Sequence, residues 1–139
     1  EAGVGKTVKL SLGGEADSNS TSVDVEATIK YIHYDSNGDP DGALISIDGV
    51  DVIINTRRIW FITTKHMEQY GANYQDYHII VVKMGYLFPD LAKIKDRGIM
   101  ALTKGTAMLD VRQLNYEKQK RPLYPLEDDF PYSTENLVF

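Results

Sequence analysis

The stretch from Tyr77 to Gly98 constrains the fold of this chain more than any other. It holds four consecutive β-branched residues, Ile79 to Val82, an apolar run that is typical of a strand buried on both faces. Pro89 follows where a helix can begin, because the missing proline N–H would be unbonded at a first helical position anyway. Gly98 suits the left-handed residue that ends many helices. The stretch therefore predicts a strand, a loop and a helix.

The end of this predicted strand is the first candidate site. In α/β sheets, ligands gather beyond the carboxyl ends of the strands. Three residues occupy that place, namely Lys83, Gly85 and Tyr86.

The rest of the first half of the chain predicts antiparallel strands. Apolar and polar residues alternate over 8–12 and again over 23–33, which indicates strands with one face in water. Two further strands, 43–48 and 50–55, flank Asp48-Gly49, a strong hairpin signal. Residues 36–42 have the composition of a turn.

Short helices and an extended tail complete the prediction. Thr63 or Thr64 can begin a helix that runs through Tyr70 and stops at Gly71. Another strand is expected over 99–102, and Asp110 can begin one helical turn. The predicted fold class is α+β: a mixed, largely antiparallel sheet with a β-hairpin and two or three short helices. Residues 1–132 are expected to form one domain, followed by a tail, 133–139, that is either native or derived from a tag.

Composition restricts the compartment and the partners. The net charge of -5 argues against nucleic acid and anionic membranes as partners. No apolar run reaches the roughly 20 residues of a membrane-spanning helix. With no cysteine, the 139-residue chain has neither disulfides nor thiolate metal sites, and we expect a cytoplasmic location. Because the sequence does not begin with Met, we expect a piece of a longer protein.

The motifs that carry catalytic chemistry are weak here. Gly5-Lys6-Thr7 resembles the end of a phosphate-binding loop, but the strand-like residues that follow do not suit that motif. The three histidines, His33, His66 and His78, lack the helical spacing of a metal motif. Asp76 and His78 lie two residues apart, yet a metal site would need a third ligand from elsewhere. We predict ordinary structural histidines and no metal in this chain.

Two arginines form the second candidate site. Arg57 and Arg58 close a predicted strand, so alternation sends their side chains to opposite faces. One of them could hold a carboxylate or reach across a domain boundary, because the guanidinium is a planar, bidentate donor. An exposed pair at the end of a strand stays the alternative.

Several blocks of the chain resemble one known family. Residues 52–58, 79–90 and 121–128 look like successive blocks of the C-terminal domain of the MlrC family, the microcystinase-C-like metallopeptidases of family M81. Residues 3–14 resemble the start of that domain, and 101–106 fall in place between the later blocks. The resemblance covers nearly the whole chain in the right order.

This resemblance implies a function for a longer protein. It implies a zinc-dependent amide hydrolase whose metal ligands lie in an N-terminal catalytic domain, so no catalytic residue is carried over to this chain. The chain would pack on that domain and shape its substrate cleft. Candidates for substrate or domain contacts are Arg57, Arg58, Lys83, Gly85 and Tyr86. The chain departs from many family members at 84–87, and this difference argues against a substrate preference shared with them.

A second class of function stays open beside this one. The chain could be an independent binding or oligomerisation module with no role in chemistry, and a homo-oligomer is open in both cases. If the chain docks on a catalytic domain, it should leave a bare apolar patch. The expected members of the patch are Trp60, Phe61, Tyr86, Leu87 and Phe88.

Overall fold

The structure is a computed structural model that describes residues 2–14, 21–84, 86–102 and 109–127. Its internal contacts divide the chain into two compact units, Glu1–Ile99 and Met100–Phe139. Among these residues, the first unit holds the sheet, two short α-helices and one 3₁₀ turn, and the second holds one 3₁₀ turn. Each unit is described by itself below.

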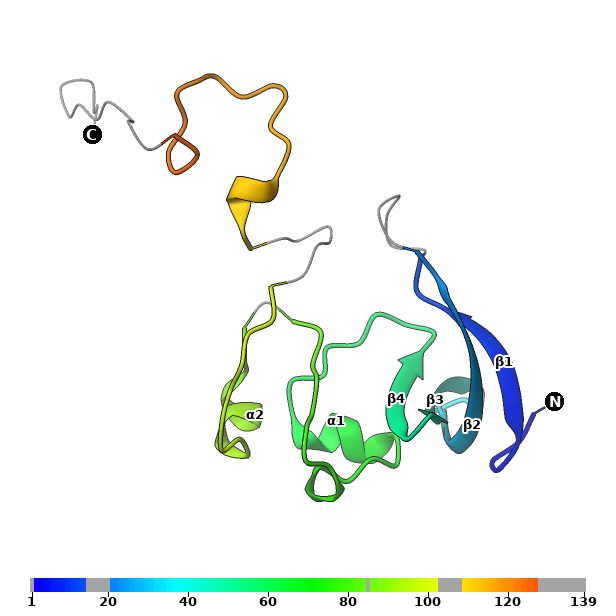
Figure 1. Ribbon diagram of the computed structural model, residues 1–139. Coiled ribbons are helices and arrows are strands. Elements are labelled where there is room, and N and C mark those ends of the chain that lie inside the picture. The colour runs from blue at the N-terminus through cyan, green and yellow to red at the C-terminus, as the bar shows by residue number, and fades with distance from the viewer. Residues whose placement is uncertain (1, 15–20, 85, 103–108, 128–139) are drawn as a thin grey trace. The chain divides into compact units, whose positions relative to one another are not determined.

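An antiparallel sheet forms the body of the first unit (Figure 1). Neighbouring strands in the sheet are also neighbours in the sequence, as the alternating segments predicted. The strands are β1 (Thr7–Leu12), β2 (Val23–Tyr34), β3 (Pro40–Ile47) and β4 (Val50–Asn55). Together with the short helices they confirm the α+β class, and every pairing in the sheet is antiparallel.

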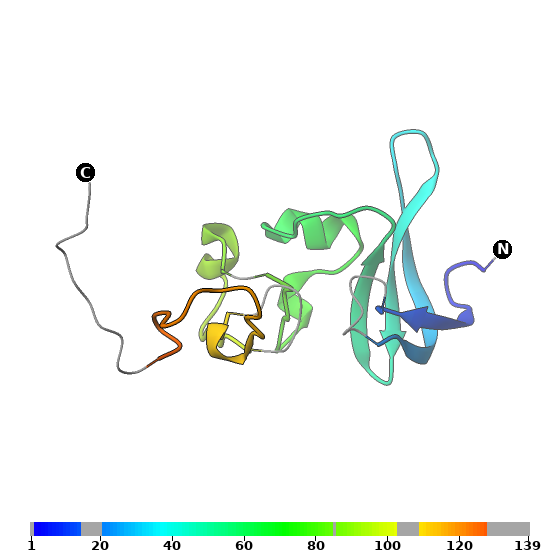
Figure 2. The ribbon, with the colours of Figure 1, turned by 90° about the horizontal axis from the view of Figure 1, so that it is seen from above.

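The two hairpin turns follow from their residues. Asp48 and Gly49 both have positive φ, 47° and 83°, which is what a tight two-residue hairpin needs. In the turn between β2 and β3, Asp35 Oδ1 accepts hydrogen bonds from the N–H groups of Asn37 and Asp39, at 2.8 and 3.1 Å. Figure 2 shows the β2–β3 hairpin from above. The Asp48-Gly49 turn is confirmed, whereas the turn predicted over 36–42 is shorter than expected because β3 begins at Pro40.

Two bulges interrupt the pairing of β2 with β3. Ile29 pairs with Ile45 and Tyr31 with Leu44, so Lys30 is an extra residue in β2. Simple alternation predicts Tyr31 and His33 on the same face as Ile29, and the bulge reverses this. A second irregularity between His33 and Tyr34 leaves Asp41 as the extra residue of β3.

The two faces of the sheet carry separate apolar clusters. One face is built around Ala27, Ile29 and Ile45, and within the described residues its other members also come from the strands. Ile32 joins this cluster because the bulge at Lys30 turns it to that side. The opposite face is covered by α1 and contributes to a cluster around Leu44, Met67 and Ala72.

The α-helices of the first unit are short. Helix α1 (Thr64–Gln69) begins after the N-cap Thr63, and Gly71 follows its end with φ 75°, as predicted. The 3₁₀ turn η1 spans Tyr74–Asp76. Helix α2 (Pro89–Lys93) begins at proline as predicted but ends at Lys93, well before Gly98. The prediction that Gly98 caps the helix is wrong, since its φ is not in the left-handed region.

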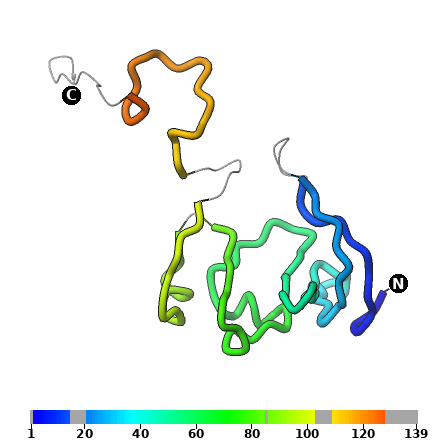
Figure 3. Tube along the Cα trace, in the orientation of Figure 1, coloured from blue at the N-terminus to red at the C-terminus, as the bar shows by residue number. Residues whose placement is uncertain are grey.

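The predicted central strand is not part of the sheet. Residues 78–84 run as an extended stretch without strand pairing (Figure 3), and Ile79 and Val81 are exposed instead of buried. An all-apolar run cannot show which side faces the core, because both faces look alike in the sequence. The prediction of a strand over 99–102 is also wrong, because these residues form no strand and Ile99, Met100 and Leu102 are exposed.

The second unit contains one 3₁₀ turn among its described residues. Turn η2 (Val111–Gln113) begins after Asp110, whose side chain accepts a hydrogen bond from Arg112 N–H, as predicted. Across both units, none of the described helices has the length and apolar character to cross a membrane.

Candidate functional site

An exposed aromatic patch is the most conspicuous surface of the first unit. It consists of Trp60, Tyr86, Leu87 and Phe88, which come from the loop before α1 and the loop before α2. The ring centroid of Phe88 lies 6.4 Å from that of Trp60 and 4.9 Å from that of Tyr86, so the three rings form one surface. Trp60 is 62% exposed and Tyr86 61%, although aromatic side chains usually bury most of their area.

Phe61 was expected in the patch, but it is half-buried and packs against a core cluster instead. It contacts the cluster of Leu44, Met67 and Ala72, and its ring lies 5.5 Å from that of Tyr70. The other expected members keep exposed area, with Phe88 half-buried and in contact with both neighbouring rings. The patch prediction is therefore wrong only for Phe61.

The predicted basic residues do not meet at one point. Strand β4 ends at Asn55, so Arg57 and Arg58 follow the strand in a bend and do not close it. Arg57 donates to Asp35 Oδ2 at 2.6 Å and thereby ties this bend to the β2–β3 turn. Arg58 and Lys83 are exposed, and within the described residues neither has an ion pair. Gly85 lies outside the described residues.

A histidine–carboxylate pair that the sequence did not reveal lies where α1 meets the sheet. His33 Nδ1 lies 2.5 Å from Asp41 Oδ1, and Asp41 is buried. The imidazole stacks on the ring of Tyr70, with 4.6 Å between centroids and an interplanar angle of 21°. Because a bulge makes Asp41 an extra residue, its position beside His33 cannot be read from alternation. The register of the β2–β3 hairpin was the only available signal.

The His33–Asp41 pair belongs to a cluster that joins several elements of the fold. The Tyr70 ring covers one face of the His33 imidazole, and the Tyr70 hydroxyl is buried with no hydrogen-bond partner in the described part of the chain. Burial raises the pKa of Tyr70, and the charge of Asp41 raises it further. The backbone carbonyl of Asp41 also accepts hydrogen bonds from both Thr56 N–H and Thr56 Oγ1. The cluster thus joins α1, β2, β3 and the end of β4.

A second polar network fixes the chain just before the extended stretch. Asp51 Oδ2 accepts hydrogen bonds from Lys30 Nζ at 2.6 Å and from the Tyr77 hydroxyl at 2.8 Å. Burial and the Asp51 carboxylate raise the pKa of Tyr77 to about 12. Although burial pushes the pKa of Asp51 up, hydrogen bonds from Lys30, Tyr77 and Ser46 leave it below its ordinary value. Tyr77 is therefore held in place by a charge-assisted bond.

Comparison with protein families matches residues 1–118 to the model described as MlrC C-terminus. The chain belongs to the MlrC C-terminus family. The match includes the aromatic patch and the blocks at 3–14, 52–58, 79–90 and 101–106. The block at 121–128 lies beyond the matched residues, and its resemblance stays a prediction. No curated protein and no solved structure matches the chain.

The described residues of this MlrC C-terminal domain do not fit a zinc site. Such a site needs about three protein ligands around one point. Within the described part of the chain, no three His, Asp or Glu side chains converge to hold a metal ion. His33 Nδ1 is engaged by Asp41, and His66 Nδ1 lies 3.2 Å from Thr63 Oγ1. Asp76 and His78 are both exposed, and Asp76 belongs to η1 and not to a strand.

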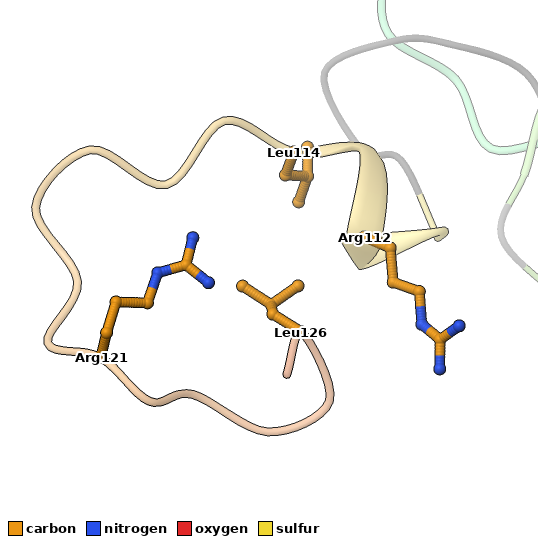
Figure 4. A pocket seen from close by; sticks show the side chains of 4 residues that line it. All are labelled: Arg112, Leu114, Arg121 and Leu126. Carbon is orange, nitrogen blue, oxygen red and sulfur yellow. The ribbon is translucent and has the colours of Figure 1, made fainter. Parts of the chain in front are cut away.

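The second unit has a small hollow, part of which lies beyond the residues that match the family. It measures about 320 Å³ and is lined by Arg112, Leu114, Arg121 and Leu126. Figure 4 shows Arg121 and Leu126 directed toward each other, whereas Arg112 points away from them. Arg121 pairs with Glu127, and that carboxylate also accepts from Leu123 N–H at 2.5 Å. Because Glu127 already neutralises Arg121, the hollow is poorly suited to an anion.

Proposed function

We propose that this chain is the non-catalytic C-terminal domain of a zinc-dependent hydrolase of the M81 metallopeptidase type. In this function it packs on the catalytic domain and forms one wall of the substrate cleft. The aromatic patch of Trp60, Tyr86, Leu87 and Phe88 is the observation that carries the proposal. Family membership supports it, because the matched family is defined as the C-terminal part of MlrC proteins.

The patch has the properties of a domain interface. Exposed apolar patches of this kind usually mark surfaces that contact another protein or domain. Aromatic side chains are enriched in such contacts and contribute much of their binding energy. The rings of Trp60 and Phe88 come from loops on either side of α1 in the sequence, and they are already in contact before any partner binds. Little ordering of side chains would then oppose docking.

The chemistry would reside in the other domain. Since the described residues offer no set of three ligands, zinc and the groups that act with it are assigned to the catalytic domain. Lys83 is exposed three residues before the patch residue Tyr86 in the sequence, and both side chains would be able to reach the rim of the cleft. Because Arg57 forms an ion pair with Asp35, it would contribute less to substrate contacts than Lys83 and Tyr86.

Replacement of Trp60 in the full-length protein tests the docking. We expect Trp60→Ala to uncouple the two domains, so that calorimetry shows either two transitions or a lowered Tm for this domain. Tyr34→Ala is the matched control, because Tyr34 is an exposed aromatic residue of β2 outside the patch. If both variants unfold alike, the patch is not a docking surface.

Steady-state kinetics tests the role in the cleft, and Lys83 separates it from docking because Tyr86 also belongs to the aromatic patch. Lys83→Ala and Tyr86→Ala in the full-length protein should raise KM or lower kcat while this domain stays folded. Arg58→Ala is a control that removes an exposed cation from the bend after β4. Kinetics that stay unchanged for Lys83 and Tyr86 would leave the domain as a scaffold without contact to substrate.

A further inference from the structure

The stretch from His78 to Lys83, called the unpaired segment below, has the side-chain pattern of a strand. Ile80 packs against the cluster of Leu44, Met67 and Ala72, and Val82 is half-buried. Ile79 and Val81 alternate with them and are 81% and 90% exposed. One face of the segment is therefore anchored to the domain, and the other presents β-branched side chains to water.

The backbone of the unpaired segment has almost no partners. Among the described residues, none of its N–H groups donates to the protein, and its one accepted backbone bond comes from Met84 N–H to Val82 O at 3.0 Å. A strand with a free edge and an apolar face is a template for another strand, which can satisfy both the backbone and the side chains.

The segment is also held in position for such pairing. Tyr77, the residue before it, donates to Asp51 at 2.8 Å, and Ile80 is anchored in the core. Through Met84 the segment leads toward Tyr86 of the aromatic patch. One partner could therefore cover the patch and lie along the segment at the same time.

We propose that the unpaired segment adds as a strand to a β-sheet of the catalytic domain, an inference that rests on the proposed function. The partner strand would place apolar residues over Ile79 and Val81. It would carry a carboxylate near Lys83, whose ammonium has no ion-pair partner within the described residues. Main-chain hydrogen bonds would provide the attachment, and the apolar pair would set the register.

Amide hydrogen exchange on the full-length protein and on this chain alone tests the strand addition. We expect the amides of residues 79–83 to exchange at least about tenfold more slowly in the full-length protein. In this chain alone they should exchange rapidly at every concentration. Equal exchange in the two proteins would refute the proposal. Protection that grows with the concentration of this chain would also refute it, since a second copy would then be the partner.

Two substitutions of Val81 identify the backbone as the attachment. Val81→Pro removes one N–H group, whereas Val81→Thr keeps that N–H and the β-branched shape. Because Val81 is almost fully exposed, both variants of this chain alone should keep the parent Tm. In the full-length protein, only Val81→Pro should lose the protection of residues 79–83.

The variants also separate this proposal from domain docking. If Trp60→Ala uncouples the domains while Val81→Pro leaves coupling and protection unchanged, docking stands and strand addition is refuted. If the full-length protein shows neither protected amides nor coupled unfolding, both proposals fail. Loss of protection in Val81→Pro, with coupling that still depends on Trp60, is the result expected if both hold.

Discussion

Gly42 is the position where one added methyl group should do the most damage to the sheet. A Cβ on Gly42 would lie 2.3 Å from Tyr70 Cε1 and 2.7 Å from the carbonyl oxygen of Ile54. Carbon atoms in ordinary contact are about 3.5–4.0 Å apart, so the Tyr70 ring would have to move by roughly 1 Å or more. The oxygen belongs to the backbone of β4 and cannot move without disturbing the sheet.

The cost of Gly42→Ala follows from how tightly Tyr70 is enclosed. Its side chain is 2% exposed and lies between the rings of His33 and Phe61. Overpacking of such a core costs about 1–3 kcal/mol, and we expect the upper end here because the ring has no free side. Loss of entropy in the unfolded chain would offset about 0.4–1 kcal/mol, since the φ of Gly42 is not in the left-handed region.

Urea unfolding followed by circular dichroism measures the effect. The net loss should be about 2 kcal/mol, which lowers the Tm of a domain near 100 residues by roughly 8–16 °C. Gly3→Ala is the matched control, because a Cβ there meets nothing within 4 Å and its φ is also outside the left-handed region. If the two variants have the same free energy of unfolding, Tyr70 does not pack on Gly42 and the described position of α1 is wrong.

Three further predictions concern the polar networks. Tyr70→Phe should leave stability unchanged or raise it by up to about 1 kcal/mol in urea unfolding, because the buried hydroxyl lacks a partner among the described residues; a loss would show a partner. The pKa of Tyr77 is about 12, above the unfolded value of about 10. The hydrogen bond from Tyr77 to Asp51 therefore stabilises the fold fully below about pH 10, and this stabilisation is lost as the pH approaches about 12. Tyr77→Phe should remove that alkaline loss from Tm measured against pH, and an unchanged slope would contradict this. Asp35→Ala should lower Tm more than Arg57→Ala, since backbone N–H groups lower the pKa of Asp35 more than Arg57 does; equal losses would contradict that order.

Local signals in the sequence predicted the antiparallel part of the fold. The alternation over 8–12 and 23–33 and the Asp48-Gly49 turn correspond to strands and a hairpin in the structure. Pro89 and Asp110 begin helical segments for the reasons that their side chains suggest, whereas Thr63 occupies the N-cap of α1 without a side-chain capping hydrogen bond. These features depend on residues close in sequence, which is why they could be predicted.

The errors occur where the decisive neighbour lies far away in the sequence. Residues 79–82 have the β-branched composition of a strand, but nothing in them indicates that none of the described strands pairs with them. The His33–Asp41 contact depends on an extra residue in β3, and polar alternation carries no trace of such an insertion. The aromatic patch was predicted because exposed rings near loops can be recognised by type, while the burial of Phe61 depended on where α1 packs.

The bulge at Lys30 decides where β2 can change its length. Deleting Lys30 would remove the bulge and place Tyr31 directly after Ile29, so Ile32 would stay on the face of the apolar cluster around Ile45 and His33 on the face of Tyr70. A one-residue deletion at Lys30 would therefore keep the environments of the C-terminal half of the strand, whereas deleting Ile32 would turn His33 toward the apolar cluster around Ile45. In alignments of related domains, a one-residue gap in β2 should therefore fall at Lys30 and not between Tyr31 and Tyr34, even where the residues themselves vary.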